Sequence, residues 1–169
     1  ARRIAGRDTG IGCDQVIVLG ASKRADVEMR IWNNEGFEVE SCGNASRCIA
    51  DLIFKEKKTT RATIDTKGGF LVAEKAGDAL VTIDNGAPRF DWKDIPLSEK
   101  FHDTRHIELQ VGPIDHPLIH SPSVVNVGNP HCIFWVDDLD VVDLSKVGPM
   151  LEHHHLFPER ANISLARVD

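Results

Sequence analysis

Hydrophobic residues change their spacing along this chain, and each spacing predicts a different element. The stretch VEMRIW (27–32) alternates apolar and polar positions, which predicts a strand buried on one face. NNEG (33–36) then predicts a turn. From Asn44 onward the apolar residues follow the i, i+3, i+4, i+7, i+8 spacing of one helix face: Ala45, Cys48, Ile49, Leu52 and Ile53. This spacing predicts a helix to about Lys57, with Cys48 in the core.

Shorter apolar runs predict further strands, at 13–19, 62–66, 70–74, 80–83, 106–111, 123–128, 132–136 and 161–168. DLSKVGPMLEHH (143–154) predicts a second helix, in which Pro149 fits only the first turn because proline has no N–H to donate. DNGAPRFDWKDIP (84–96) combines glycine, two prolines and mixed charge, which predicts a boundary near residue 90. We therefore expect an α+β protein with two related halves, residues 1–90 and 91–169, the second incomplete.

Composition narrows the classes of function. The chain has 169 residues and a net charge of −6, which argues against nucleic acid or an anionic membrane as a partner. Its apolar runs fall short of the ~18 residues that suggest a membrane span. Four cysteines are too few for a disulfide scaffold in a chain of this length, so we expect a reducing cytoplasm.

The stretch ESCGNASRC (40–48) places Cys42 directly before the predicted helix. The first amides of a helix have no partner within it, and the helix dipole is positive at that end, so a thiolate or a ligand carboxylate is stabilised there. Gly43 leaves room for a ligand beside the backbone, and Asn44 adds an amide that both donates and accepts. Taken alone, however, a free cysteine is more often an inert, small residue.

No metal is expected. The adjacent residues His153, His154 and His155 cannot all converge from a helix, and no spaced Cys or His partner completes a zinc site. Cys42 and Cys48 project about 120° apart around a helix with ~3.6 residues per turn, so the two thiols should not meet.

Four stretches closely resemble the diaminopimelate epimerases: GCDQ (12–15), RIWNNEGFEVESCGNASRC (30–48), GNPHC (128–132) and GPMLEHHHLFPERANI (148–163). The resemblance implies two pseudosymmetric halves, each a curved, mostly antiparallel sheet around a central helix. It also implies epimerisation of LL-diaminopimelate to the meso form, in lysine and peptidoglycan synthesis, with no cofactor, pyridoxal phosphate or metal. Diaminopimelate would be the small-molecule substrate, and the family's dimers leave a homodimer open.

The resemblance also assigns roles to individual residues. Cys42 matches one of two thiols that move the α-proton, and His131 matches a histidine that assists this transfer. The remaining residues match substrate ligands, with Gly43 and Asn44 at the reacting end and Gln15, Asn33, Asn129 and Asn162 at the distal amino acid end. Amides suit a zwitterion because they donate and accept without charge. Taken singly, Asn33 could be only a turn residue and Asn129 only a loop residue before proline.

The chain departs from the family pattern in three places. Ala45 and Ser46 stand where Gly-Ala is common, and both fit a first helical turn. The family's opening segment with a substrate-binding asparagine has no counterpart in these residues, and neither does the motif that carries the second thiol. We therefore expect this chain alone to be unstable and unable to epimerise.

Other functions remain open. One is another cofactor-free isomerase of the same fold, such as a proline racemase or a phenazine-type isomerase, although the paired asparagines favour diaminopimelate. A second is an inactive fragment. A third is a thiol redox or metal protein, which needs two sulfurs within reach of each other.

Overall fold

The structure, a computed structural model, describes residues 1–168 and divides into two compact units. Unit 1 is Ala1–Gly86, and unit 2 begins at Ala87. Each unit has an apolar core of its own, so each can be described by itself. That these units are the two expected halves of an epimerase stays a prediction.

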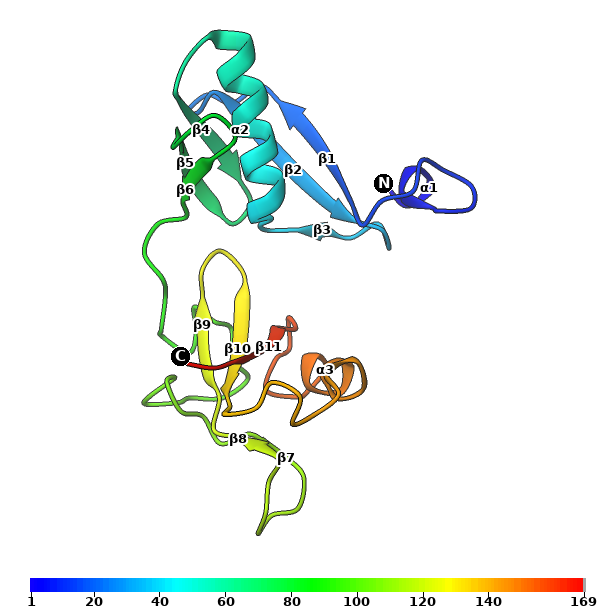
Figure 1. Cartoon of the computed structure of the whole chain (residues 1–169), viewed down its shortest axis with the longest axis vertical. Coiled ribbons are helices and arrows are strands. Elements are labelled where there is room, and N and C mark those ends of the chain that lie inside the picture. Colours follow the sequence, from blue (N-terminus) through cyan, green and yellow to red (C-terminus); the bar gives the residue numbers. More distant parts are fainter. Residues whose placement is uncertain (169) are drawn as a thin grey trace. The chain divides into compact units, whose positions relative to one another are not determined.

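Unit 1 is a sheet that packs against one long helix (Figure 1). Its elements are α1 (Arg2–Ala5), β1 (Gln15–Gly20), β2 (Val27–Asn33), β3 (Glu38–Val39), α2 (Gly43–Lys57), β4 (Arg61–Thr66), β5 (Gly69–Lys75) and β6 (Val81–Asp84). The strand order is β1-β2-β4-β5-β6, and β3 pairs with β2. Only the β2–β4 pairing is parallel among these described strands. The helix α2 lies in the connection between those two strands, as a parallel pairing requires. The short helix α1 was not expected.

The helix α2 buries a different face from the one that its apolar residues predict. The buried residues keep the predicted spacing but begin one position later: Ser46, Ile49, Ala50, Ile53 and Phe54. Cys48 is exposed and Leu52 is 55% exposed, so the prediction that Cys48 lies in the core is wrong. A polar residue can begin the buried face because the Ser46 hydroxyl donates to the carbonyl oxygen of Cys42 at 3.0 Å. This bond offsets the cost of burying the hydroxyl.

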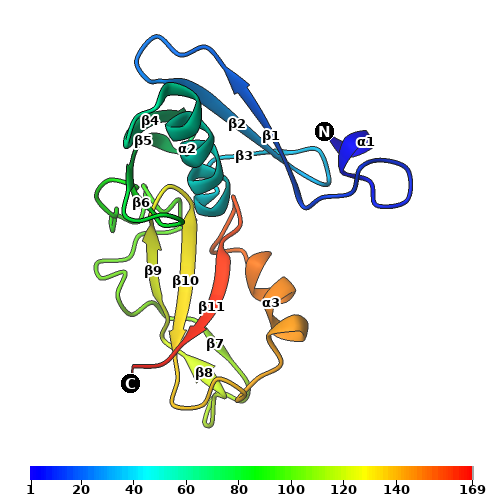
Figure 2. The same ribbon diagram turned by 45° about the horizontal axis from the view of Figure 1, so that its top comes forward.

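Unit 2 contains a small mixed sheet and one helix (Figure 2). Its elements are β7 (Gln110–Val111), β8 (Ile119–His120), β9 (Ser123–Asn126), β10 (Pro130–Trp135), α3 (Leu144–Glu152) and β11 (Asn162–Ala166). Strand β10 lies between β9, which is antiparallel to it, and β11, which is parallel to it. Strands β7 and β8 form a separate antiparallel pair. Helices and strands in both units confirm the α+β class.

The strand that was predicted at 106–111 is wrong over most of its length, because only Gln110–Val111 forms a strand. Ile107 is nevertheless buried, and its N–H donates to the carbonyl oxygen of Pro122 at 3.0 Å. The apolar run therefore indicates that the segment is buried. A packed loop and a strand can have the same apolar spacing, so the spacing does not distinguish between them.

The position of Pro149 also differs from the prediction. The helix α3 begins at Leu144, after Asp143 as its N-cap, so Pro149 lies beyond the first turn. A proline there leaves the carbonyl oxygen of Ser145 without its usual helical donor. Both residues are exposed, so water can supply that bond.

Candidate functional site

Cys42 is the N-cap of α2. Its backbone is extended, with φ −150° and ψ 99°, and its sulfur accepts a hydrogen bond from the Ala45 N–H at a distance of 3.4 Å. Serine, threonine, aspartate or asparagine usually fills this role. The first turn of α2 contains no acidic residue. The thiol is therefore held at the positive end of a 15-residue helix dipole whose first turn contributes no negative charge of its own.

Gly43 and Asn44 form the first turn that follows the thiol. Both are exposed, and a Cβ placed on Gly43 would meet no atom within 4 Å. Packing among the described residues therefore does not require a glycine there, which is consistent with space kept for a ligand. The Asn44 side-chain oxygen accepts from the Arg47 guanidinium. Within the described helix, the backbone N–H groups of Gly43 and Asn44 have no partner, because the N–H groups of a first turn have no preceding helical carbonyl oxygen to bond.

Gln15 and Asn33 face each other across β1 and β2. They are directly paired in the antiparallel register. The pair Ile17 and Ile31 lies two positions further along the strands, and Ile31 is fully buried. Both amides are therefore on the core-facing side of the sheet, because side chains alternate with a period of two. The Asn33 side-chain oxygen also accepts from the Phe37 N–H at 2.9 Å, so this asparagine closes the turn after β2.

In unit 2, three predicted site residues come together around the start of β10. The Nε2 atom of His131 lies 3.0 Å from the Asn129 side-chain oxygen. His131 is also the direct partner of Asn162 in the parallel β10–β11 register. The Asn162 amide nitrogen donates to the carbonyl oxygen of Pro130 at 3.0 Å. His131 is half-buried, and this burial lowers its pKa from the ordinary 6.5, so that the neutral ring is favoured at pH 7.

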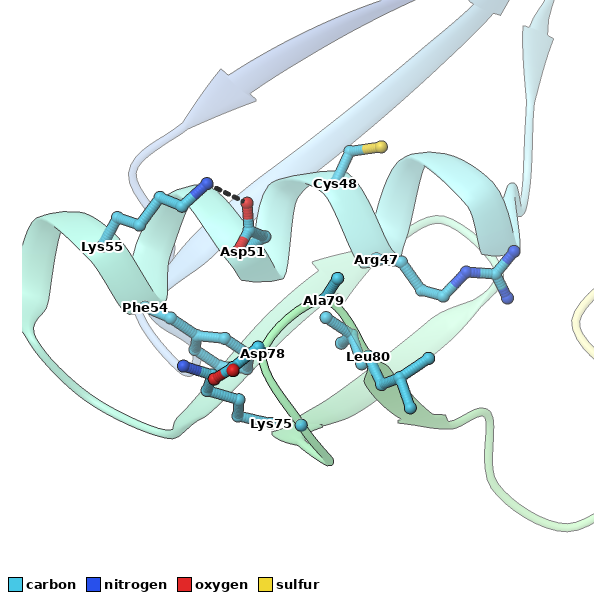
Figure 3. A pocket seen from close by; sticks show the side chains of 11 residues that line it. Arg47, Cys48, Asp51, Phe54, Lys55, Lys75, Asp78, Ala79 and Leu80 are labelled. Atoms are coloured by element: carbon cyan, nitrogen blue, oxygen red, sulfur yellow. Dashed lines mark hydrogen bonds and ion pairs between the residues drawn. The ribbon is translucent and has the colours of Figure 1, made fainter.

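The other cysteines have different surroundings. Cys132 is fully buried in β10, and burial raises the pKa of its thiol to about 12. Cys48 lies on the rim of a cavity of about 320 Å³ between α2 and the turn before β6 (Figure 3). An ion pair of 2.6 Å between Lys55 and Asp51 crosses the helix surface beside it. Neither this cavity nor its lining was predicted from the sequence, and it includes none of the candidate site residues.

The three consecutive histidines are held by local contacts. The His153 ring nitrogen Nδ1 lies 2.8 Å from the carbonyl oxygen of Pro149, and the rings of His154 and His155 are 4.3 Å apart. Within residues 1–168, no group of three or more His, Cys, Asp and Glu residues is arranged to hold a metal ion. None of the helices in these residues has both the length and the apolar character that a membrane span requires.

Asn126, which was not predicted as a site residue, is 4% exposed at the end of β9. Its side chain makes hydrogen bonds to Arg89, Asp94 and Gly128. A signal was present in the sequence, because the period of two along β9 puts Asn126 on the same face as the buried Val124. A polar residue at a position predicted to be buried indicates a hydrogen-bonded role.

Comparison with known proteins gives consistent results. The diaminopimelate epimerase family model matches residues 1–90. A diaminopimelate epimerase of Afipia carboxidovorans is 51% identical over 162 residues, which are 94% of this chain and 56% of that protein. One from Brucella anthropi is 49% identical over an alignment that covers 99% of this chain and 57% of that protein. The chain thus spans about half the length of the curated relatives that it matches.

Solved structures with low sequence identity share the fold. A hydroxyproline epimerase from Agrobacterium vitis, with bound trans-4-hydroxy-L-proline, has a TM-score of 0.53 and 18% identity. The match covers 90% of this chain and 41% of that one. A predicted epimerase from Pseudomonas aeruginosa has a TM-score of 0.51 and 19% identity. This match covers 90% of this chain and 54% of that one. At these identities the likeness shows a common fold.

Proposed function

Since the chain belongs to the diaminopimelate epimerase family, we propose that it takes part in the inversion of one α-carbon of diaminopimelate between the LL and meso forms. The proposed reaction is independent of a cofactor. Cys42 exchanges the α-proton, and the glycine and amide residues that match the family motifs bind the amino acid groups of the substrate. The observation that carries this proposal is the position of the Cys42 thiol as the N-cap of α2.

The chemistry explains why a thiol suits this position. An α-proton beside a carboxylate is a very weak acid, so its removal requires a positioned base and stabilisation of the carbanion. When the Cys42 thiolate removes the proton, the C–H bond breaks and an S–H bond forms. The electron pair of the C–H bond stays on the α-carbon and spreads into the carboxylate. The unpaired N–H groups of Gly43 and Asn44 are suited to bind that carboxylate as its charge grows.

Inversion also requires a second acid, which returns a proton to the opposite face and forms the new C–H bond there. We propose a thiol for this role too, so that the reaction uses two cysteines in turn. Cys132 is unsuited, because it is fully buried and out of reach of a substrate, and because burial raises the pKa of its thiol to about 12, so that it is a poor acid at neutral pH. Cys48 is unsuited as well, because it projects from the exposed side of α2 rather than from its first turn.

The distal amino acid end is assigned to four amides. Gln15 and Asn33 are cross-strand partners, and Asn129 and Asn162 both lie beside His131. A zwitterion presents donors and acceptors together, and an amide side chain can satisfy both without adding charge. Because Asn33 uses its oxygen in the turn, its amide nitrogen is the part assigned to the substrate.

His131 is assigned to the transfer of protons to and from a thiol. Its Nε2 atom faces the Asn129 oxygen, which can only accept, so Nε2 carries the proton and Nδ1 is the basic nitrogen. Burial lowers the pKa of His131, so the ring is neutral near pH 7 and its Nδ1 lone pair is available.

Deuterium exchange tests the proposal. The intact protein would be incubated with LL-diaminopimelate in D₂O, and deuterium at the α-carbon would be followed together with the meso isomer. Labelled meso product is the expected result for a protein that also supplies the second thiol, whereas the 169 residues alone are expected to give no meso product. A folded protein that has both thiols and gives neither label nor inversion contradicts the proposal.

The same experiment with proline tests the substrate class. We expect no label in proline, because the amides assigned to the distal end would have no second amino acid group to bind. Label in proline without label in diaminopimelate would replace the proposed substrate by a proline-like one.

A further inference from the structure

The buried side chain of Asn126 joins three parts of unit 2. Its oxygen accepts from the Gly128 N–H at 2.8 Å and from the Arg89 guanidinium at 2.9 Å. Its nitrogen donates to the carbonyl oxygen of Asp94 at 2.7 Å. The backbones of Asn126 and Arg89 also exchange two hydrogen bonds, of 2.9 and 3.0 Å. The end of β9 is therefore tied to the segment that opens unit 2.

Only an amide of this length fits these contacts. The position requires an acceptor for two donors and a donor for one carbonyl oxygen, and an asparagine side chain provides both. Aspartate would keep the acceptor but would place a second oxygen against the Asp94 carbonyl. Because Asn126 is 4% exposed, water cannot readily replace a missing partner.

The contact with Gly128 connects the Asn126 side chain to the candidate site residues. Gly128 has a φ of +107°, a backbone conformation that side chains rarely allow, and it directly precedes Asn129. The Val127 N–H donates to the Asn129 carbonyl oxygen at 3.2 Å and closes the turn. The Asn129 side chain then contacts His131. A chain of direct contacts thus runs from Asn126 through the turn to both candidate residues.

We propose that Asn126 is a positioning residue that fixes the Gly128 turn and thereby orients Asn129 and His131. Its effect on turnover rests on the function proposed above, whereas its effect on the geometry of the turn does not. Asn126 does not itself bind the substrate in this proposal.

The first test measures geometry without activity. The ring of His131 would be titrated by NMR in the intact protein with ¹³C-labelled histidine, and its signal assigned with His131→Gln. In Asn126→Ala the turn loses its acceptor, so we expect the titration of His131 to move toward that of an exposed histidine. Exchange of the Gly128 amide with solvent should become about tenfold faster or more, because an N–H that loses its buried acceptor is no longer protected.

Two variants separate positioning from stability. Ser123→Ala removes hydrogen bonds at the opposite end of β9, where Ser123 accepts from Trp135 and donates to Arg105. It should lower the melting temperature and leave the His131 titration and Gly128 exchange as they are. Asn126→Asp keeps the Gly128 acceptor and loses the Asp94 bond, so exchange of the Gly128 amide should rise by less than in Asn126→Ala. If Asn126→Ala does not fold, this exchange in Asn126→Asp decides the question, because the added carboxylate also moves the His131 titration through its charge.

The second test measures kcat/KM for diaminopimelate. We expect Asn126→Ala to lower it about tenfold to a hundredfold, since small misplacements of positioning groups have effects of this size, and Ser123→Ala to leave it unchanged at a temperature where both variants are folded. If folded Asn126→Ala and Asn126→Asp both keep the wild-type His131 titration, the inference is overturned. If the wild-type protein does not act on diaminopimelate, the proposed function fails, but the NMR measurements still decide the role of Asn126.

Discussion

The two units hold their candidate residues in different ways. In unit 1 the thiol of Cys42 is fixed by the first turn of one helix, through a bond to an amide only three residues further along the chain. In unit 2 the His131 imidazole contacts Asn129, two residues before it, but the strand that carries His131 is paired with β11, and the Asn162 side chain there bonds to the Pro130 carbonyl oxygen 32 residues away. The arrangement around Cys42 therefore forms together with α2, whereas the arrangement around His131 requires the folded sheet of unit 2.

This difference has a consequence for substitutions. A helix cap depends on local backbone geometry, so conservative changes at Cys42 should remove its chemistry while the helix remains. A group that is held by long-range contacts can be disturbed from a distance, as at Asn126, whose side chain contacts residues 32 and 37 positions away.

The largest effect is expected from Cys42→Ser. Serine is a good N-cap, so α2 should keep its start, but a hydroxyl is a far weaker acid and a poor proton carrier near neutral pH. Exchange of the α-proton of diaminopimelate in D₂O should fall by about 100-fold or more. Circular dichroism should stay as in the wild type.

Cys48→Ser is the matched control, because Cys48 lies on the same helix but on its exposed side. It should exchange deuterium at the wild-type rate. Unchanged exchange in Cys42→Ser, or an equal loss in both variants, would show that the cap does not supply the reacting thiol.

The second prediction concerns the buried face of α2, on which the cap depends. Ile53 is 3% exposed and Leu52 is 55% exposed, although the two residues are adjacent and have side chains of equal size. Ile53→Ala should therefore lower the free energy of unfolding by about 2–5 kcal/mol. Leu52→Ala should change it by less than about 0.5 kcal/mol. Urea unfolding followed by circular dichroism measures both values, and a larger loss for Leu52→Ala would restore the face that the apolar spacing predicts.

The local elements of unit 1 were largely predictable from the sequence. Alternation predicted β2, shorter apolar runs predicted β4 and β5, and the position of Cys42 before a helix followed from the change of period at Asn44. The face of α2 was not predictable in the same way, because a buried serine carries no apolar signal and its hydroxyl is satisfied by a carbonyl oxygen. The spacing of apolar residues gives the period of a buried helix face, but it does not show which polar residues are also buried on that face.

In unit 2 the contacts around His131 could not be predicted from spacing. The parallel register that pairs His131 with Asn162 depends on the long connection through α3, and no local pattern specifies that register. The buried loop around Ile107 resembles a strand in its apolar spacing, because burial on one face imposes the same alternation on any extended segment. Motif resemblance identified the residues themselves, whereas the structure is needed for their contacts.

The smallest effect should appear on acidification from pH 7 to pH 5, which we expect to weaken unit 2 and to leave unit 1 unchanged. All 8 histidines of the chain lie beyond residue 100, in unit 2. Burial lowers the pKa of His131 from the ordinary 6.5, and burial together with the neighbouring His155 lowers the pKa of His154. These rings bind protons more readily in the unfolded chain, so stability falls as the pH drops below about 6.5.

Unit 1 responds in a lower pH window. The hydrogen bond from Lys57, helped by bonds from Thr63, lowers the pKa of Asp26 from 3.8 to about 2. A carboxyl group with a depressed pKa stabilises the fold above its unfolded value, and this stability is lost as the pH falls through the folded value. Amide hydrogen exchange, corrected for its own pH dependence and read separately in peptides of each unit, measures both windows. His131→Gln should reduce the loss of protection in unit 2 between pH 7 and pH 5. Asp26→Asn should lower the protection of unit 1 at neutral pH, where the carboxylate stabilises the fold, and should reduce its further loss only below about pH 4. Equal losses in both units above pH 5 would mean that the histidines do not set the difference, and that the two units respond to acid through groups they have in common.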